Sequence, residues 1–208
     1  MIVVIDYDTG NVRNVKNALD YLGVENTLSA DPQTILSASG IILPGVGAFA
    51  KAMDALKERN LIDVIKQAAK NGIPILGICL GMQLLFDYSL EFGKTKGLSL
   101  IDGSVVQIPN DVGVKVPHMG WDKNEVVSDD PMGIPFANQF TYFVHSFYVK
   151  TAQANVIAKV DYGVEIPSIV RKNNVIGVQF HPEKSGRIGL AGLEKFKELI
   201  LDADYSRD

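Results

Sequence analysis

The sequence predicts an α/β fold: a three-layer α/β/α arrangement whose mostly parallel central sheet is extended by antiparallel strands from the second half of the chain. In the first half, short apolar strands alternate with helical patterns, which is typical of right-handed βαβ crossovers. Residues 74–78 are continuously apolar, as expected of a central strand that is covered on both faces. In the second half, strand patterns follow one another closely and are separated by turn residues, which favours antiparallel pairs added to the sheet.

The elements of the first half follow from hydrophobic spacing and from stop signals. Apolar residues recur at helical spacing up to Gly23, and Asn71-Gly72 is a C-terminal cap signal for a later helix. We expect strands at 2–5, 24–29, 40–43 and 74–78, and helices at 12–22, 48–58, 61–70 and 80–88. In the second half we expect strands at 104–107, 124–127, 141–149, 155–160, 166–171 and 174–180, and a closing amphipathic helix at 188–201. With no linker and no internal repeat, the chain is interpreted as one domain, residues 1–208.

Composition narrows the function classes. Hydrophobic residues make up 47% and charged residues 21% of the chain, which is ordinary for a soluble globular domain. The net charge is −4, and no cluster of Lys and Arg offers the basic face that nucleic acid requires. No apolar stretch approaches the ~20 residues that cross a bilayer. The single cysteine excludes an internal disulfide and the N-terminus lacks the basic region of a signal peptide, so we expect a cytoplasmic protein.

Cys79 is the candidate nucleophile. It lies in Gly77-Ile78-Cys79-Leu80-Gly81, after an apolar strand and before a helical pattern, which is the cysteine version of the nucleophile elbow. Small residues two places before and after the nucleophile let neighbouring backbone pass the sharp turn. A helix N-terminus favours the attacking thiolate. The alternative is a buried core cysteine, since free cysteine is among the most buried residue types.

His181 and Glu183 are the candidate base and its orienting acid. In an extended segment residues i and i+2 point to the same side, and Pro182 keeps His181 out of the helical region. Such a pair suits a base that an acid holds in one tautomer. Two other interpretations remain: a surface ion pair, or half of a metal site completed by His118 and His145. Because no ligand spacing is recognisable, we predict no metal.

A glycine-containing loop follows the third predicted strand, at residues 44–49. Its glycines let backbone N–H groups turn toward a ligand, so the N–H groups of Val46 and Gly47, with that of Leu80, could stabilise an oxyanion. The loop also matches a dinucleotide fingerprint, but it follows the wrong strand and no acid ends the next one. A flavin phosphate loop at residues 6–11 is disfavoured because its carboxylates would repel phosphate and only Thr9 offers a hydroxyl at its centre. We therefore expect no cofactor.

Taken together, these motifs resemble the class I glutamine amidotransferases. The resemblance is carried by Pro44-Gly45-Val46-Gly47, by the segment from Gly77 to Gln83 and by His181-Pro182-Glu183, so it spans most of the chain. Further segments are similar to the glutaminase subunits of imidazole glycerol phosphate synthases, namely Ile5-Asp6-Tyr7, Gly10-Asn11, Pro117-His118-Met119-Gly120-Trp121, Tyr142-Phe143-Val144-His145-Ser146 and Lys184-Ser185-Gly186. Two positions depart from that pattern: Asp122 stands where asparagine is expected, and Phe147 where tyrosine is frequent.

The resemblance implies a glutaminase with a Cys79, His181 and Glu183 triad that forms a thioester and releases ammonia. It implies that glutamine is bound by Gln83, Glu91, Ser146 and Phe147. It also implies a heterodimer with a cyclase subunit that uses the ammonia in histidine biosynthesis. Our candidate docking surface is Trp121 with His118, Met119 and Lys184, because aromatic residues and Met are enriched in interfaces. The alternative is that Trp121 is a core residue. Three alternatives stay open at this stage: a stand-alone cysteine hydrolase of similar fold, a flavodoxin-like binding module, and a glutaminase that serves another synthase.

Overall fold

The computed structural model describes residues 1–8 and 11–205. Its main sheet contains β1 (Ile2–Ile5), β2 (Asn26–Ser29), β3 (Gly40–Gly45), β4 (Ile75–Cys79), β9 (Glu125–Val126), β12 (Val156–Asp161), β13 (Glu165–Lys172) and β14 (Val175–Val178). The helices are α1 (Val12–Tyr21), α2 (Pro32–Leu36), α3 (Phe49–Glu58), α4 (Leu61–Lys70), α5 (Leu80–Leu84) and α6 (Gly186–Tyr205), with 3₁₀ turns η1 (Pro131–Phe136), η2 (Gln153–Asn155) and η3 (Pro182–Lys184). Thr9 and Gly10, which entered the sequence predictions, lie outside the described residues.

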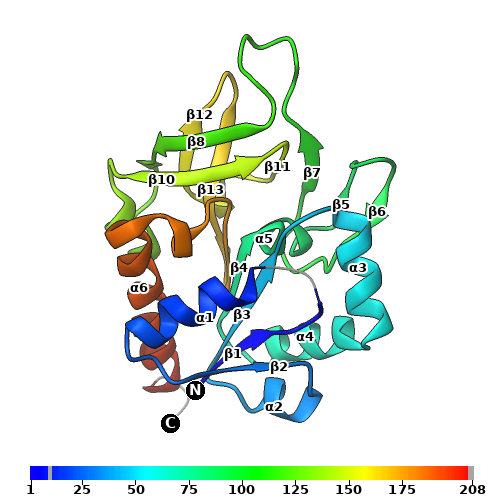
Figure 1. The fold of residues 1–208 in the computed structure, drawn as a ribbon, viewed down its shortest axis with the longest axis vertical. Coiled ribbons are helices and arrows are strands. Elements are labelled where there is room, and N and C mark those ends of the chain that lie inside the picture. Colours follow the sequence, from blue (N-terminus) through cyan, green and yellow to red (C-terminus); the bar gives the residue numbers. More distant parts are fainter. Residues whose placement is uncertain (9–10, 206–208) are drawn as a thin grey trace.

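The main sheet has the strand order β2-β1-β3-β4-β14-β13-β12-β9 (Figure 1). Neighbouring strands from β2 to β14 are parallel, and those from β14 to β9 are antiparallel. The predicted fold class is therefore confirmed: a parallel sheet from the first half is extended at one edge by antiparallel strands from the second half. β14 pairs with β4, so a strand from the second half of the chain lies beside the strand that ends in Cys79.

Helices cover both faces of this sheet. Successive strand residues alternate between two hydrophobic clusters: Val3 and Ile41 face the cluster of α3 and α4, whereas Val4 and Ile42 face the cluster that includes α1 and α6. Figure 1 shows α1 and α6 on one side of the sheet and α3 and α4 on the other. Burial on both faces explains why the central strands are continuously apolar. No helix within the described ranges is long and apolar enough to cross a membrane.

The sequence prediction added the antiparallel strands of the second half to the main sheet. This was wrong for some of them, which form two smaller sheets. The predicted strand 141–149 is interrupted at Ser146 into β10 (Phe140–His145) and β11 (Phe147–Lys150). β10 pairs with β8 (His118–Lys123) in a two-stranded sheet, whereas β11 belongs to a four-stranded sheet with β7 (Ser104–Gln107), β5 (Tyr88–Ser89) and β6 (Thr95–Lys96). The break at Ser146 matters because it places backbone groups of Ser146 and Phe147 at the cavity described below.

Further elements differ from the sequence prediction, among them the two-residue strands β5 and β6, which were not predicted. The helix expected at 80–88 ends at Leu84, because the carbonyls of Leu84 and Leu85 accept hydrogen bonds from Leu98 N–H and Leu100 N–H, both at 2.8 Å. The returning loop thus replaces the next helical turn. α2 and β8 were not predicted, since α2 is only 5 residues long and β8, HMGWDK, contains glycine and charged residues that are depleted in strands.

Candidate active site

Cys79 occupies a strained turn between β4 and α5. Its backbone has φ 55° and ψ −110°, a conformation that a non-glycine residue adopts only when its surroundings enforce it. The enforcement is steric: a Cβ on Gly81 would lie 1.8 Å from the Leu43 carbonyl oxygen, and one on Gly77 would lie 2.7 Å from the Gly81 carbonyl oxygen. Only glycine fits at both positions, so the strand–turn–helix setting predicted for Cys79 is present.

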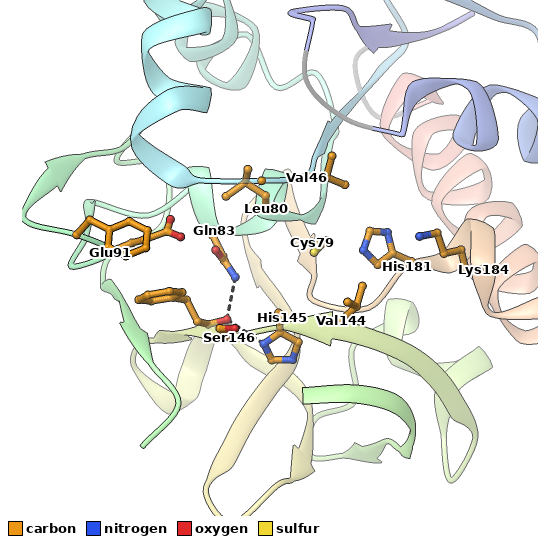
Figure 2. A pocket seen from close by; sticks show the side chains of 13 residues that line it. Val46, Cys79, Leu80, Gln83, Glu91, Val144, His145, Ser146, His181 and Lys184 are labelled. Carbon is orange, nitrogen blue, oxygen red and sulfur yellow. Dashed lines mark hydrogen bonds between the residues drawn. The ribbon is translucent and has the colours of Figure 1, made fainter. Parts of the chain in front are cut away.

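His181 meets Cys79 because their strands are neighbours. β14 runs parallel to β4 with Val178 opposite Ile78, so both strands end at the same edge of the sheet. The ring Nδ1 of His181 lies 2.8 Å from Oε1 of Glu183, and the side chains of His181 and Glu183 are 2% and 1% exposed. A carboxylate can only accept, so Nδ1 carries the proton and Nε2 is left to interact with Cys79. Cys79 and His181 lie side by side in Figure 2.

The protonation of His181 follows from its neighbours. Burial alone lowers the pKa of this imidazole, but the hydrogen bonds and the negative charges of Cys79 and Glu183 outweigh it and raise the pKa to about 9. His181 is therefore protonated at neutral pH and holds a proton that it can give to a leaving group.

Other contacts hold the His181 backbone in place. Its N–H donates to the Tyr142 carbonyl at 3.0 Å. The Ser185 hydroxyl donates to the His181 carbonyl at 2.7 Å and accepts from the Tyr142 N–H at 3.0 Å. On the other side of the pair, Asn11 Nδ2 donates to Glu183 Oε1 at 3.4 Å. His181 is thus anchored to β10 as well as to the main sheet.

A cavity of about 400 Å³ opens in front of Cys79 and His181. Figure 2 shows its side chains converging from the elbow, from β10 and from the loop after β5. The cavity gathers all the predicted oxyanion and glutamine-binding residues: Val46, Gly47, Leu80, Gln83, Glu91, Ser146 and Phe147. Gly47 has φ +97°, a conformation that favours glycine, which agrees with the backbone role predicted for this loop.

Two of the predicted substrate-binding side chains also have structural contacts. Glu91 Oε2 accepts from the N–H of Phe49, the first residue of α3, at 2.6 Å, and so caps that helix at the cavity wall. Gln83 Nε2 donates to the Phe147 carbonyl at 2.9 Å and to Gln179 Oε1 at 3.1 Å. These contacts fix where the two side chains stand before any ligand is present.

Gln179 was missed by the sequence analysis. Its side chain is fully buried, and its Nε2 lies 3.8 Å from the Cys79 sulfur, within the range of a weak hydrogen bond to a thiolate. The signal was available: in an extended segment Gln179 lies on the same side as His181, by the alternation that placed Glu183 there. Ser185 was quoted only as part of a motif, although it bonds to the base's own backbone.

The residues predicted at the partner surface do not share one environment. Met119 and Trp121 on β8 are 62% and 52% exposed. His118 is only 1% exposed, so it lies beneath that surface, stacked on Phe143. Lys184 reaches the cavity rim, with its ammonium 5.9 Å from the centre of the Tyr142 ring.

Comparison with known proteins places this geometry in a family. The model described as "Glutamine amidotransferase class-I" matches residues 3–197. The chain belongs to this family. Among its relatives is the imidazole glycerol phosphate synthase subunit HisH of Lacticaseibacillus casei (strain BL23), 63% identical over 208 residues and 100% of both chains. The protein of the same name from Lactiplantibacillus plantarum is 54% identical and covers 99% of both chains.

Solved structures share the amidotransferase fold. A crystal structure of a glutamine amidotransferase has a TM-score of 0.76 at 21% identity and covers 96% of this chain and 99% of its own. The structure of PurLQS from Thermotoga maritima has a TM-score of 0.71 at 24% identity and covers 97% of both chains. The family match therefore agrees with the fold, and the elbow and the arrangement of Cys79, His181 and Glu183 occur within the matched residues.

Proposed function

We propose that this chain hydrolyses glutamine to glutamate and ammonia, with Cys79 as the nucleophile. The observation that carries the proposal is the arrangement of Cys79, His181 and Glu183 at the rim of one cavity, with the His181 pKa raised to about 9. Membership of the class I glutamine amidotransferase family supports it. A non-catalytic binding module does not require a cysteine in a strained turn beside a protonated histidine.

The chemistry proceeds in two stages on the same sulfur. The Cys79 thiolate attacks the side-chain amide carbon of glutamine, and His181 gives its Nε2 proton to the departing nitrogen, so that ammonia leaves and a thioester remains. Water then attacks the thioester while His181 takes one of its protons. Glutamate leaves and the Cys79 thiolate is restored. Glu183 keeps the His181 ring in the tautomer that both proton transfers need.

Backbone and side-chain groups of the cavity complete the site. The N–H groups of Val46, Gly47 and Leu80 stabilise the oxyanion that forms when the amide carbon becomes tetrahedral. Glu91 pairs with the glutamine α-ammonium, and the backbone at Ser146 and Phe147 receives its α-carboxylate. Gln83 orients this wall through its hydrogen bond to the Phe147 carbonyl.

The ammonia is delivered to a cyclase subunit, which makes imidazole glycerol phosphate and an aminoimidazole carboxamide ribonucleotide in histidine biosynthesis. Full-length relatives named imidazole glycerol phosphate synthase subunit HisH, at 63% and 54% identity, support this assignment. The chain acts as one glutaminase domain, residues 1–208, in a cytoplasmic heterodimer. Its docking surface includes the exposed Met119 and Trp121, since aromatic residues and Met are enriched in interfaces.

The test is to measure glutamate release from glutamine by the full chain, alone and with the cyclase subunit and its ligand. We expect turnover that depends on glutamine and rises with the partner. A chain that cleaves peptides and leaves glutamine intact would identify the alternative, a stand-alone cysteine hydrolase. For the docking surface, Trp121→Ala should weaken partner affinity, whereas an unchanged dissociation constant would remove Trp121 from the interface.

A further inference from the structure

A chain of hydrogen bonds outside the catalytic triad connects the β8 surface with the cavity. Asp122 Oδ2 lies 2.6 Å from His118 Nε2, and His118 Nδ1 lies 3.0 Å from His145 Nε2. His145 Nδ1 in turn lies 2.9 Å from the carbonyl oxygen of Phe147, which lines the cavity. The two imidazoles are buried, whereas the Asp122 side chain is 34% exposed beside Trp121.

Both ends of this chain can only accept hydrogen bonds, because one end is a carboxylate and the other is a carbonyl. The three contacts therefore need three protons, one in each gap. Two neutral imidazoles carry one N–H each and supply only two. The complete chain must hold one additional proton, in the gap between His118 Nε2 and Asp122, with His118 donating to His145 and His145 donating to Phe147.

The surroundings decide which histidine can take that proton. Burial, with the positive charges of His118 and His181, lowers the pKa of His145 to about 3, so His145 stays neutral. His118 is stacked between Phe143 and Tyr162, and the Tyr162 hydroxyl donates to the Lys115 carbonyl and not to the ring. Burial lowers the pKa of His118, and Asp122 opposes this only in part, so the additional proton leaves as the pH rises.

Once that proton has left, the contacts compete for two protons. A hydrogen bond to a carboxylate is charge-assisted and roughly twice as strong as one between neutral groups. Asp122 therefore keeps the His118 Nε2 proton, and His118 Nδ1 becomes an acceptor. The one proton of His145 can then fill only one of its two contacts. When Nε2 donates to His118, the Nδ1 lone pair faces the Phe147 carbonyl, and the bond at the cavity is lost.

We propose that Asp122, His118 and His145 are positioning residues for glutamine: by setting the tautomer of His145 they hold or release the Phe147 backbone that forms one wall of the substrate site. The Phe147 carbonyl also accepts from Gln83, so its release loosens a second contact of the cavity. The proposal rests on the proposed glutaminase function for its kinetic consequence, but the tautomer itself does not depend on activity.

Asp122→Asn separates the two states. An asparagine has nearly the same shape, but its amide N–H can donate to His118 Nε2, so neutral imidazoles complete all three contacts without an additional proton. Imidazole ¹⁵N shifts can be followed by NMR in the full chain, which contains only three histidines. We expect the His145 proton on Nδ1 at low pH and on Nε2 at high pH in the natural chain, and on Nδ1 throughout in Asp122→Asn. The same tautomer in both proteins at every pH would overturn the proposal.

The kinetic test follows glutamine turnover by the chain in complex with the cyclase subunit. In the natural chain the KM for glutamine should rise roughly fivefold with pH, equivalent to about 1 kcal/mol for one neutral hydrogen bond, while kcat changes less than twofold. Asp122→Asn should remove this rise, whereas the exposed charge-matched control Asp54→Asn should keep it. Equal KM profiles in Asp122→Asn and the natural chain would contradict positioning. Absence of any glutamine hydrolysis would instead refute the proposed function, and the NMR result would then decide the tautomer alone.

Discussion

The two walls of the cavity are held in different ways. The wall that carries Cys79 is set by backbone packed against backbone, with no room for a Cβ at Gly77 or Gly81. The opposite wall, at Phe147, is held by side-chain hydrogen bonds from Gln83 and His145. Steric exclusion is insensitive to pH or to a neighbour's charge, whereas a polar network depends on every proton in it. Cys79 is therefore held by packing alone, whereas the position of the Phe147 wall depends on the protonation of its neighbours.

The largest effect should come from removing the proposed nucleophile. Cys79→Ala should lower glutamine hydrolysis by on the order of 10³-fold or more, because no other group of the cavity can form the thioester. Steady-state glutamate release measures this, and circular dichroism confirms that the variant is folded. Activity close to that of the natural chain would show that Cys79 is a core cysteine.

Gly81→Ala tests the steric wall directly. The added methyl would lie 1.8 Å from the Leu43 carbonyl oxygen, which is backbone and cannot turn aside. We expect the free energy of unfolding to fall by about 3 kcal/mol, or soluble protein to be lost. Gly113→Ala is the matched control: it has open space and φ +77°, so it should cost only about 1 kcal/mol. Equal denaturation midpoints for the two variants would contradict a packed elbow.

Glu183→Gln tests how the negative charge of Glu183 affects His181, the proposed base. The substitution keeps an acceptor for His181 Nδ1 but removes a negative charge that raises the His181 pKa, so that pKa should fall. Glu183 Oε2 has no hydrogen-bond partner among the described residues, so the new amide loses no existing contact. We expect glutamine hydrolysis to drop roughly tenfold, less than in Cys79→Ala, since the imidazole is still present. NMR titration of His181 and the rate are read together; an unchanged rate would leave Glu183 without a catalytic role.

Gln83→Met tests the Phe147 wall. The side chain keeps its volume but no longer donates to the Phe147 carbonyl or to Gln179. Gln179 Oε1 then loses the donor Gln83, and the Phe147 carbonyl keeps only its contact with His145. Leaving a buried acceptor unpaired costs about 1–3 kcal/mol, and we expect it to appear mainly as a KM for glutamine raised about tenfold, with the elbow intact. If kcat falls by the same factor while KM stays constant, Gln83 acts on the chemical step and not on the wall.

The parallel strands and the cysteine elbow could be predicted from local sequence patterns. The parallel strands were predicted because burial on both faces requires continuous apolar runs, and the Gly77 to Gly81 segment because the elbow admits only small residues. The predicted ends of helices and strands were wrong where segments distant in the chain form hydrogen bonds with them. α5 ends early because a returning loop bonds its last carbonyls, and β10 and β11 separate at Ser146 because they pair with different partners.

The sequence by itself determined the local features of the candidate site: a cysteine at a glycine-flanked turn and a histidine with an acid two residues later in an extended segment. These are local properties, set by backbone conformation and side-chain direction. Only the tertiary structure decided that Gln179 contacts the Cys79 sulfur, that His118 lies beneath the β8 surface, and that Asp122 is connected through two imidazoles to the Phe147 carbonyl. Those relations join residues that are distant in the chain, and hydrogen bonds form between atoms that the fold brings within about 3 Å of each other, which spacing along the chain does not encode.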